Sequence, residues 1–318
     1  MQDLKDYCQP FSKADGDWPK LPLPPDAIEM RWRRWLLATP QEDQWQALRS
    51  ELPQLLLTPQ PLTQLADRYQ RLVLRGESPQ PKDLEIAPRL KDPSGFSITI
   101  ANHACGAVPV LTVSHHDDFV LIIRCLAHRC ENIPVRNTVH AQAVAGLIHW
   151  GMIREFDAKS RCQLLILHRA PYSSLDASSI PNNPNLDQWL EQSQRWRLEH
   201  ELTHIACRKL AGEMRINLFD ELIADAIGMK TALGSFHADL FRQGLGLNRD
   251  GTTQDDARAH IYVQMLDPIY HVAACQMVLA RAKELEQLLE AKQLPSNSIE
   301  LLKILTQSTL DQPLAPIF

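Results

Sequence analysis

EHELTHIA, residues 199–206, is the segment around which the rest of the chain can be interpreted. It places His200 and His204 four positions apart, with Glu201 directly after the first histidine. On a helix the two histidines fall about 40° apart on one side. Two imidazoles at this spacing can bind one metal ion, and Glu201 can contact a water molecule held by that ion. Chance produces the pattern in roughly 3% of chains with this many histidines, so the pattern alone only suggests a site.

The segment lies within an expected helix that begins near Asn185 and ends at Ala211. Asn185 and the asparagines before it can cap the first turn, and Gly212 stands where a left-handed residue commonly ends a helix. Apolar residues occupy the side opposite the histidines. This pattern is typical of a helix between a hydrophobic core and a cleft.

A second segment, NLFDELIADAIGM (217–229), follows closely in the chain. Glu221 and Asp225 are again four apart, on one side of a predicted helix. By themselves, two acids at this spacing are usually a solvated helix face. After the histidine pair, they can supply a third metal ligand and an aspartate that accepts a hydrogen bond from a ligand histidine. Ala224 and Gly228 share that side, and their small size would let the two helices approach closely.

Together the two segments resemble the gluzincin class of zinc metallopeptidases, the thermolysin-like relatives. HELTH (200–204) matches their HExxH motif and ELIAD (221–225) matches their downstream ExxxD motif. The resemblance implies a zincin-like body in which Zn²⁺ is bound by His200, His204 and Glu221. It further implies that Glu201 is the general base and that Asp225 is the hydrogen-bond partner of a ligand histidine.

The resemblance also raises the question of which residue stabilises the oxyanion. In gluzincins a histidine, tyrosine or arginine downstream of the third ligand has this role. His260 is the first candidate here and Tyr262 the second, with Tyr270 and His271 as alternatives, although any of these can equally be a core or surface residue. A metzincin is excluded, because Leu210 stands where that class has its third histidine.

The function that these residues predict is that of a zinc metallopeptidase, a hydrolase and protease acting on a peptide or protein substrate. The peptide follows from the resemblance, since the ligand spacing by itself indicates only a hydrolytic zinc site. One alternative is a zinc hydrolase of a non-peptide amide or ester. Others are a catalytically idle zincin-like binding or regulatory protein, and a helical interaction protein with an accidental motif. An extended substrate would pair with an edge strand, for which residues 162–169 and 96–101 are candidates.

The rest of the sequence contains segments with helical periodicity and segments with the composition of strands. Residues 1–26 are expected to be an extended arm, and the proline-rich residues 76–95 a linker or long loop. Helices are predicted over 27–74, over 138–151 and from 185 onward. Strands are predicted, from β-branched and apolar runs, over 96–103, 107–113, 118–127 and 161–171.

The fold class expected from this pattern is α+β and mostly helical, with a small β-sheet. Residues 1–90 would form an N-terminal arm and helical extension. Residues 91–318 would form the zincin-like catalytic domain, strand-rich over 96–170 and helical over 185–310.

Composition limits the function classes. The chain has 318 residues, of which 44% are hydrophobic and 22% charged, with a net charge of −5. This balance gives no general attraction to nucleic acid or anionic lipid, so neither is expected as a partner. No apolar run approaches the ~20 residues that cross a membrane.

The cysteines and the N-terminus indicate the compartment. The seven cysteines form no CxxC pair, and the N-terminus has no secretory signal, so a reducing cytoplasm is expected. The oligomeric state is left open.

Two further patterns have plain structural explanations. RWRRW (31–35) interleaves arginine with tryptophan, as in nucleic-acid sites, but a packed tryptophan side with solvated arginines explains it equally well. Cys125, His128 and Cys130 suggest a small metal site, but no second ligand cluster follows at zinc-finger spacing. The other histidines are expected to be structural: His103, His115, His116, His140 and His149.

Overall fold

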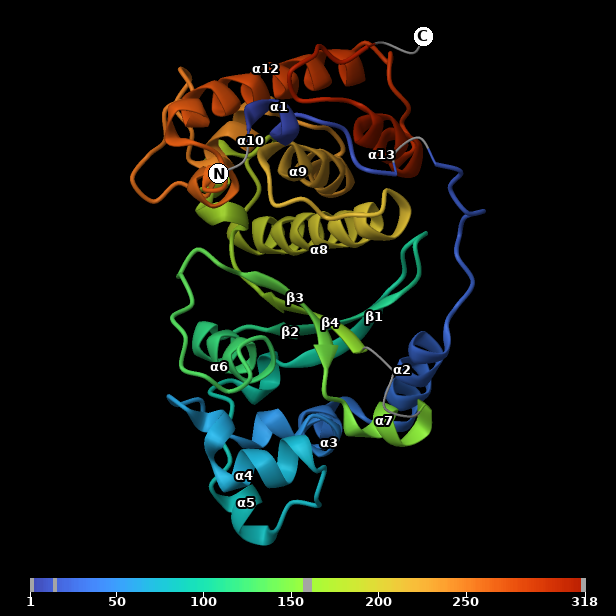
Figure 1. Ribbon diagram of the computed structural model, residues 1–318, viewed down its shortest axis with the longest axis vertical. Coiled ribbons are helices and arrows are strands. Elements are labelled where there is room, and N and C mark those ends of the chain that lie inside the picture. Colours follow the sequence, from blue (N-terminus) through green and yellow to red (C-terminus); the bar gives the residue numbers. More distant parts are fainter. Residues whose placement is uncertain (1–2, 14–15, 157–161, 316–318) are drawn as a thin grey trace. The chain divides into compact units, whose positions relative to one another are not determined.

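The computed structural model describes residues 3–13, 16–156 and 162–315 (Figure 1). The chain forms two compact units. We call Pro22–Ala170 the sheet unit, and Met1–Leu21 with Pro171–Phe318 the helical unit. Helix predominates, and the described residues contain one small four-stranded sheet, as the sequence predicts. No helix in the described part of the chain has the length and apolar character needed to span a membrane.

The sheet has the strand order β1-β2-β4-β3. β1 pairs antiparallel with β2, β2 runs parallel to β4, and β3 pairs antiparallel with β4. The three strands predicted near residues 97, 108 and 162 are therefore confirmed. The strand bounds are Ser97–Ala101 (β1), Val108–Val113 (β2), Ala141–Leu147 (β3) and Cys162–His168 (β4).

The strand predicted over 118–127 is wrong, because His116–Leu126 forms helix α6. The run is rich in β-branched residues, which misled the prediction, but its large apolar side chains also recur at helical spacing. The His115 side chain accepts a hydrogen bond from the Asp117 backbone and so starts the helix. The buried side of α6 is formed by Phe119, Ile122, Ile123 and Leu126.

The helix predicted over 138–151 is also wrong. Ala141–Leu147 is the edge strand β3, and helix α7 (Trp150–Phe156) begins only after it. Pairing with the open edge of β4 overrides the helical preference of the alanines. Gly146, at φ +71°, lies at the register shift between Ala145 and Leu147, a β-bulge that needs a residue tolerant of positive φ.

The N-terminal helices of the sheet unit share one core with the strands. Trp32 and Leu48 are fully buried in the same cluster as Ile98 and Leu111. A boundary near residue 90 would cut through this core, so the units divide elsewhere than the sequence suggests. The helices concerned are α2 (Ala27–Ala38), α3 (Gln44–Glu51), α4 (Asp67–Tyr69) and α5 (Pro81–Glu85).

The proline-rich segment 76–95 is not a linker between units. Asp83, at 5% exposure, binds Arg68 at 3.0 Å and Arg71 at 2.7 Å and so anchors the segment to the helices before it. In the RWRRW stretch both tryptophans are buried and Arg31 pairs with Glu51 at 2.7 Å, which agrees with the structural explanation.

The helical unit includes the start of the chain. Residues 3–13, expected to be an extended arm, instead carry the short helix α1 (Leu4–Tyr7) and pack into this unit. The Tyr7 hydroxyl donates to the Tyr262 carbonyl at 3.1 Å and accepts from the Leu218 amide at 2.8 Å. The larger helices are α8 (Leu186–Leu210), α9 (Leu218–Leu233), α10 (Ala238–Leu245), α11 (Ala259–Val263), α12 (His271–Glu290) and α13 (Ser298–Gln307).

Short 3₁₀ and π segments connect these elements. They are η1 (Gln41–Asp43), η2 (Pro53–Leu56), η3 (Thr63–Leu65), the π-helix η4 (Gln70–Leu74), η5 (Pro93–Gly95), η6 (Tyr172–Ser174), η7 (Ala177–Ser179) and η8 (Pro268–Tyr270).

Helix α8 confirms the helix predicted from Asn185 to Ala211. The Asn185 and Gln188 side chains form a capping box at its start, and Gly212 adopts φ +84° directly after its end. Helices α8 and α9 lie side by side (Figure 1), joined by a short connection. The two segments that carry the predicted ligands are therefore brought into contact.

Candidate metal centre

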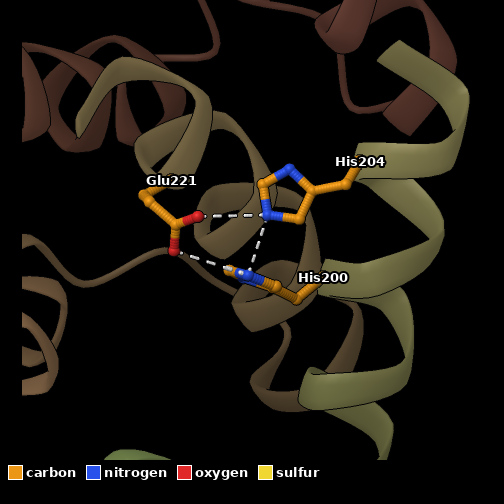
Figure 2. Close-up of side chains that lie close together, drawn as sticks. All are labelled: His200, His204 and Glu221. Carbon is orange, nitrogen blue, oxygen red and sulfur yellow. Dashed lines mark hydrogen bonds and ion pairs between the residues drawn. The ribbon is translucent and has the colours of Figure 1, made fainter. Parts of the chain in front are cut away.

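The site begins with two histidines one turn apart on α8. His200 and His204 are 6% and 7% exposed, and their Nε2 atoms lie 3.0 Å apart. The rings meet nearly edge to face, with an angle of 85° between their planes. Figure 2 shows both rings directed toward the same point beside α9. The i, i+4 spacing thus brings the two Nε2 atoms together, as the sequence predicts.

Glu221 on α9 completes the cluster. Its carboxylate lies 3.2 Å from His204 Nε2 through Oε1 and 3.6 Å from His200 Nε2 through Oε2. These three residues form a group able to hold a metal ion within the described part of the chain. A tetrahedral zinc site with bonds of about 2.0–2.1 Å would place its ligand atoms about 3.3 Å apart, close to the separations found here.

Gly228 lets the two helices approach closely enough for this contact. A Cβ atom on Gly228 would lie 2.8 Å from both the Cδ1 atom and the backbone carbonyl of Trp196, and 3.3 Å from the His200 amide. The carbonyl is part of α8 and cannot move aside as a flexible side chain can. The absence of a side chain at Gly228, anticipated from the sequence, is therefore a requirement of the site.

Asp225 holds His200 from the side remote from the cluster. Its Oδ1 atom lies 2.8 Å from His200 Nδ1 and accepts a hydrogen bond from Trp196 Nε1 at 3.0 Å. The Tyr172 hydroxyl, from η6, donates to the same oxygen. Nδ1–H donation to Asp225 leaves the lone pair of His200 on Nε2, directed toward the cluster. The partnership predicted between Asp225 and a ligand histidine is thus present in the geometry.

Asp220 lies beside the outer ring nitrogen of His204, a neighbour that the sequence reasoning missed; the two atoms are at ion-pair distance but form no hydrogen bond. Its carboxylate is fully buried, and Oδ1 lies 3.2 Å from His204 Nδ1. The signal was available in the sequence: Asp220 directly precedes Glu221, so it points about 100° round the helix from the ligand. Asp225 lies one turn further along, and each histidine therefore has its own aspartate.

The cluster has an excess of buried negative charge. Asp220, Glu221 and Asp225 contribute −3, and Arg258 contributes +1, leaving −2 when the imidazoles are neutral. Burial by itself would raise the pKa of Glu221, but His200, His204 and Arg258 lower it below its ordinary value. Burial would lower the pKa of His204, but Asp220 and Glu221 raise it well above its ordinary range. The raised pKa means that a proton on His204 supplies part of the compensation in the metal-free protein, and a divalent cation can replace that proton.

Arg258 is a neighbour of the cluster that was not expected. Its Nη2 donates to Glu221 Oε2 at 2.7 Å and to the Tyr262 hydroxyl at 3.3 Å. Its guanidinium also lies over the Tyr172 ring, 5.7 Å from the centroid. Burial would lower the pKa of Arg258, but Tyr262, Tyr172 and the nearby carboxylates raise it, so the group is a permanent cation beside Glu221.

A comparison with models of protein families gave one match, which extends over nearly the whole chain. A family of unknown function, DUF7005, matches residues 1–162 and 157–315. The chain belongs to this family. The match spans both compact units, so the DUF7005 family includes the sheet unit as well as the helices that carry the cluster. The comparison with curated proteins gave no match, and the comparison with solved structures gave none.

The remaining candidate residues of this DUF7005 protein are placed as follows. Glu201 is partly buried on α8 and acts electrostatically on Arg197, whose pKa burial lowers to about 10. Tyr262 contacts the cluster through Arg258, and burial raises the pKa of its hydroxyl. His260, the first candidate for the oxyanion residue, is exposed, and its Nε2 lies 3.1 Å from the Gln254 carbonyl. The structure does not bring His260 into the cluster.

The other histidines and cysteines singled out in the sequence lie outside this cluster. Cys125 and Cys130 are fully buried and donate to the carbonyls of Leu57 and Gln54, which fits a structural role. His149 is 1% exposed and accepts from the Met152 amide through Nδ1. His115 caps α6, as described above.

Proposed function

We propose that this chain is a zinc-dependent hydrolase of the gluzincin type, a metallopeptidase that cleaves peptide bonds. One observation supports the proposal above all others: two buried imidazole Nε2 atoms and one carboxylate converge within 3.6 Å of one another. A His₂Glu donor set leaves a fourth position open for water or substrate, as catalytic zinc sites do. The aspartate behind each histidine is the arrangement that fixes such ligands in place.

In this proposal His200, His204 and Glu221 hold Zn²⁺. A zinc ion bound in this way supplies a water of pKa about 7 and polarises the substrate carbonyl. Glu201 would be the general base, which would hold a proton taken from the attacking water and return it to the leaving amine. Asp225, hydrogen-bonded to His200, would keep the lone pair of that imidazole on Nε2, and Asp220 would act in the same way on His204 from 3.2 Å.

Arg258 and Tyr262 are better placed than His260 to stabilise the developing oxyanion. Arg258 contacts Glu221 directly, and the Tyr262 hydroxyl lies 3.3 Å from the Arg258 guanidinium. Preorganised donors beside a ligand carboxylate contribute most where charge develops in the transition state. His260 has no comparable contact with the cluster among the described residues.

The substrate class follows from the resemblance of residues 200–225 to the gluzincin motifs, and the donor set supports only hydrolysis. A zinc hydrolase of a non-peptide amide or ester would use the same residues in the same roles. A catalytically idle binding protein would retain the ligands without needing Glu201.

Metal content and hydrolysis test the proposal together. Purified wild type should contain about one zinc per chain by elemental analysis, and Glu221→Ala should lose most of it, whereas the exposed Glu290→Ala should not. Glu201→Gln should keep its zinc and lose at least about 100-fold in the rate of peptide-library cleavage. A wild-type protein that stays metal-free after zinc is resupplied would refute the proposal. Equal cleavage by Glu201→Gln would leave a metal site without the proposed chemistry.

A further inference from the structure

The sheet unit contains a cavity of about 570 Å³ that is separate from the metal centre. All of the residues around it belong to Pro22–Ala170. Three elements form its walls: the segment from Gln64 to Leu74, the end of α6, and the edge strand β3. Small-molecule sites commonly measure about 300–1,000 Å³, so the cavity is large enough for a metabolite-sized ligand.

Tyr69 gives the cavity an unused hydrogen-bond donor. The residue is 2% exposed and lines the cavity, yet its hydroxyl makes no hydrogen bond with any residue that the structure describes. The hydroxyl is not one of the fully buried atoms that lack a partner, so its oxygen is accessible to a bound molecule. Burial raises the pKa of Tyr69, so the hydroxyl remains a protonated donor at neutral pH. An oxygen acceptor on a ligand would satisfy it.

The lining has one charged side chain, and that side chain is a cation. Arg129 is exposed at the cavity and forms no ion pair with a described residue, and no carboxylate lines the cavity. The amides of Gln64 and Gln70 add polar groups. Apolar surface makes up much of the rest, from Leu65, Leu74, Leu126, Val144 and Leu147.

The backbone around the cavity is irregular at three places. Gln70–Leu74 is a π-helix, β3 carries its bulge between Ala145 and Leu147, and Arg129 adopts φ +51°. π-Helical turns, bulges and left-handed residues are all enriched at functional sites, because each re-aims side chains at a local cost in stability. Three such features around one cavity agree with a binding role.

We propose that the sheet unit binds a small amphipathic carboxylic acid in this cavity. The carboxylate accepts the Tyr69 hydroxyl and pairs with Arg129, and the apolar body of the ligand lies against Leu65, Leu74 and Leu126. This binding function is separate from hydrolysis at the metal centre and does not depend on it.

Fluorescence titration of the full-length chain with 1-anilinonaphthalene-8-sulfonate tests the proposal, since this probe combines an anion with an apolar body. Wild type should bind one equivalent saturably, and decanoate should displace it. Tyr69→Phe, which keeps the shape of the side chain, should weaken binding about fivefold to tenfold. Arg129→Gln should weaken it similarly. Ala145→Trp, which fills the cavity from an exposed position, should abolish binding, whereas the exposed Ala38→Trp should bind as wild type does.

Two results would overturn the proposal. Probe binding that Ala145→Trp and Tyr69→Phe leave unchanged would place the probe elsewhere. Displacement by decanol as effective as that by decanoate would remove the role of the carboxylate. Glu221→Ala should bind the probe as wild type does, and loss of binding in that variant would show that the sulfonate reports the metal centre instead.

Discussion

Nδ1 of His204 lies 3.2 Å from Asp220, and Nδ1 of His200 is hydrogen-bonded to Asp225 at 2.8 Å. Both aspartates come from α9, the helix that also supplies Glu221. One turn and a half of α9 therefore carries the third candidate ligand and the partners of the other two. Asp220 is therefore a second candidate partner of the site, although only the Asp225 contact is a hydrogen bond.

Asp220→Asn should lower the affinity for zinc about 10-fold to 100-fold, because the amide removes the charge that orients and polarises His204. Competition with a chromophoric zinc chelator measures this affinity. Asp256→Asn, at an exposed position of the same unit, is the matched control. Equal affinities in the two variants would contradict the role given to Asp220.

Arg258→Gln should destabilise the metal-free protein by about 2–4 kcal/mol, because Glu221 then loses the cation 2.7 Å from its Oε2 atom. Added zinc should reduce this difference, since the ion takes over the compensation of the carboxylate. Thermal melts of wild type and variant, each with zinc and with a chelator, measure the coupling. A difference that zinc leaves unchanged would argue against a metal at Glu221.

Gly228→Ala should lower the free energy of unfolding by about 1–3 kcal/mol, despite the better helix propensity of alanine. The added Cβ would lie 2.8 Å from the Trp196 carbonyl and force α8 and α9 apart. Gly244→Ala is a matched control within helix α10. There the new Cβ would lie 3.5 Å from Ser173, an ordinary contact, so the variant should be neutral or slightly stabilised. Urea denaturation of both variants measures the contrast.

His149 should make the stability of the sheet unit depend on pH. Burial lowers the pKa of His149 from 6.5 to about 3. As the pH falls from 6.5 toward 3, the unfolded chain binds a proton that the folded chain cannot, so stability is full above pH 6.5 and declines through this window. The loss between pH 7 and pH 5 should be about 2 kcal/mol.

Urea denaturation at several pH values measures this dependence. His149→Asn, which retains an acceptor for the Met152 amide, should flatten the pH profile between 7 and 5 even if its overall stability is lower. Asn137→Ala, at an exposed position of the same unit and without a titrating group, should leave the slope unchanged. An unchanged slope in His149→Asn would show that other groups govern the pH dependence.

The candidate ligands could be found from the sequence because their geometry is local. An i, i+4 pair on a helix fixes its own relative position, and capping residues fixed the limits of α8. Gly228 could be identified because helical spacing puts it on the ligand side, where a small residue allows two helices to pack closely.

The secondary structure of the sheet unit was predicted less well, because its strands depend on distant partners. His116–Leu126 has the composition of a strand but the spacing of a helix, and Ala141–Leu147 becomes a strand only because β4 offers it an edge. Propensity is a weak guide where tertiary pairing decides.

The sequence by itself determined the two helices that bear His200, His204 and Glu221, because helical periodicity is a property of neighbouring residues. Only the tertiary structure decided that Asp220 faces His204 and that Arg258, 37 positions after Glu221, lies against its carboxylate. It also decided that the N-terminal residues belong to the helical unit. These relations arise from burial and charge compensation between segments distant in the chain, which no local pattern encodes.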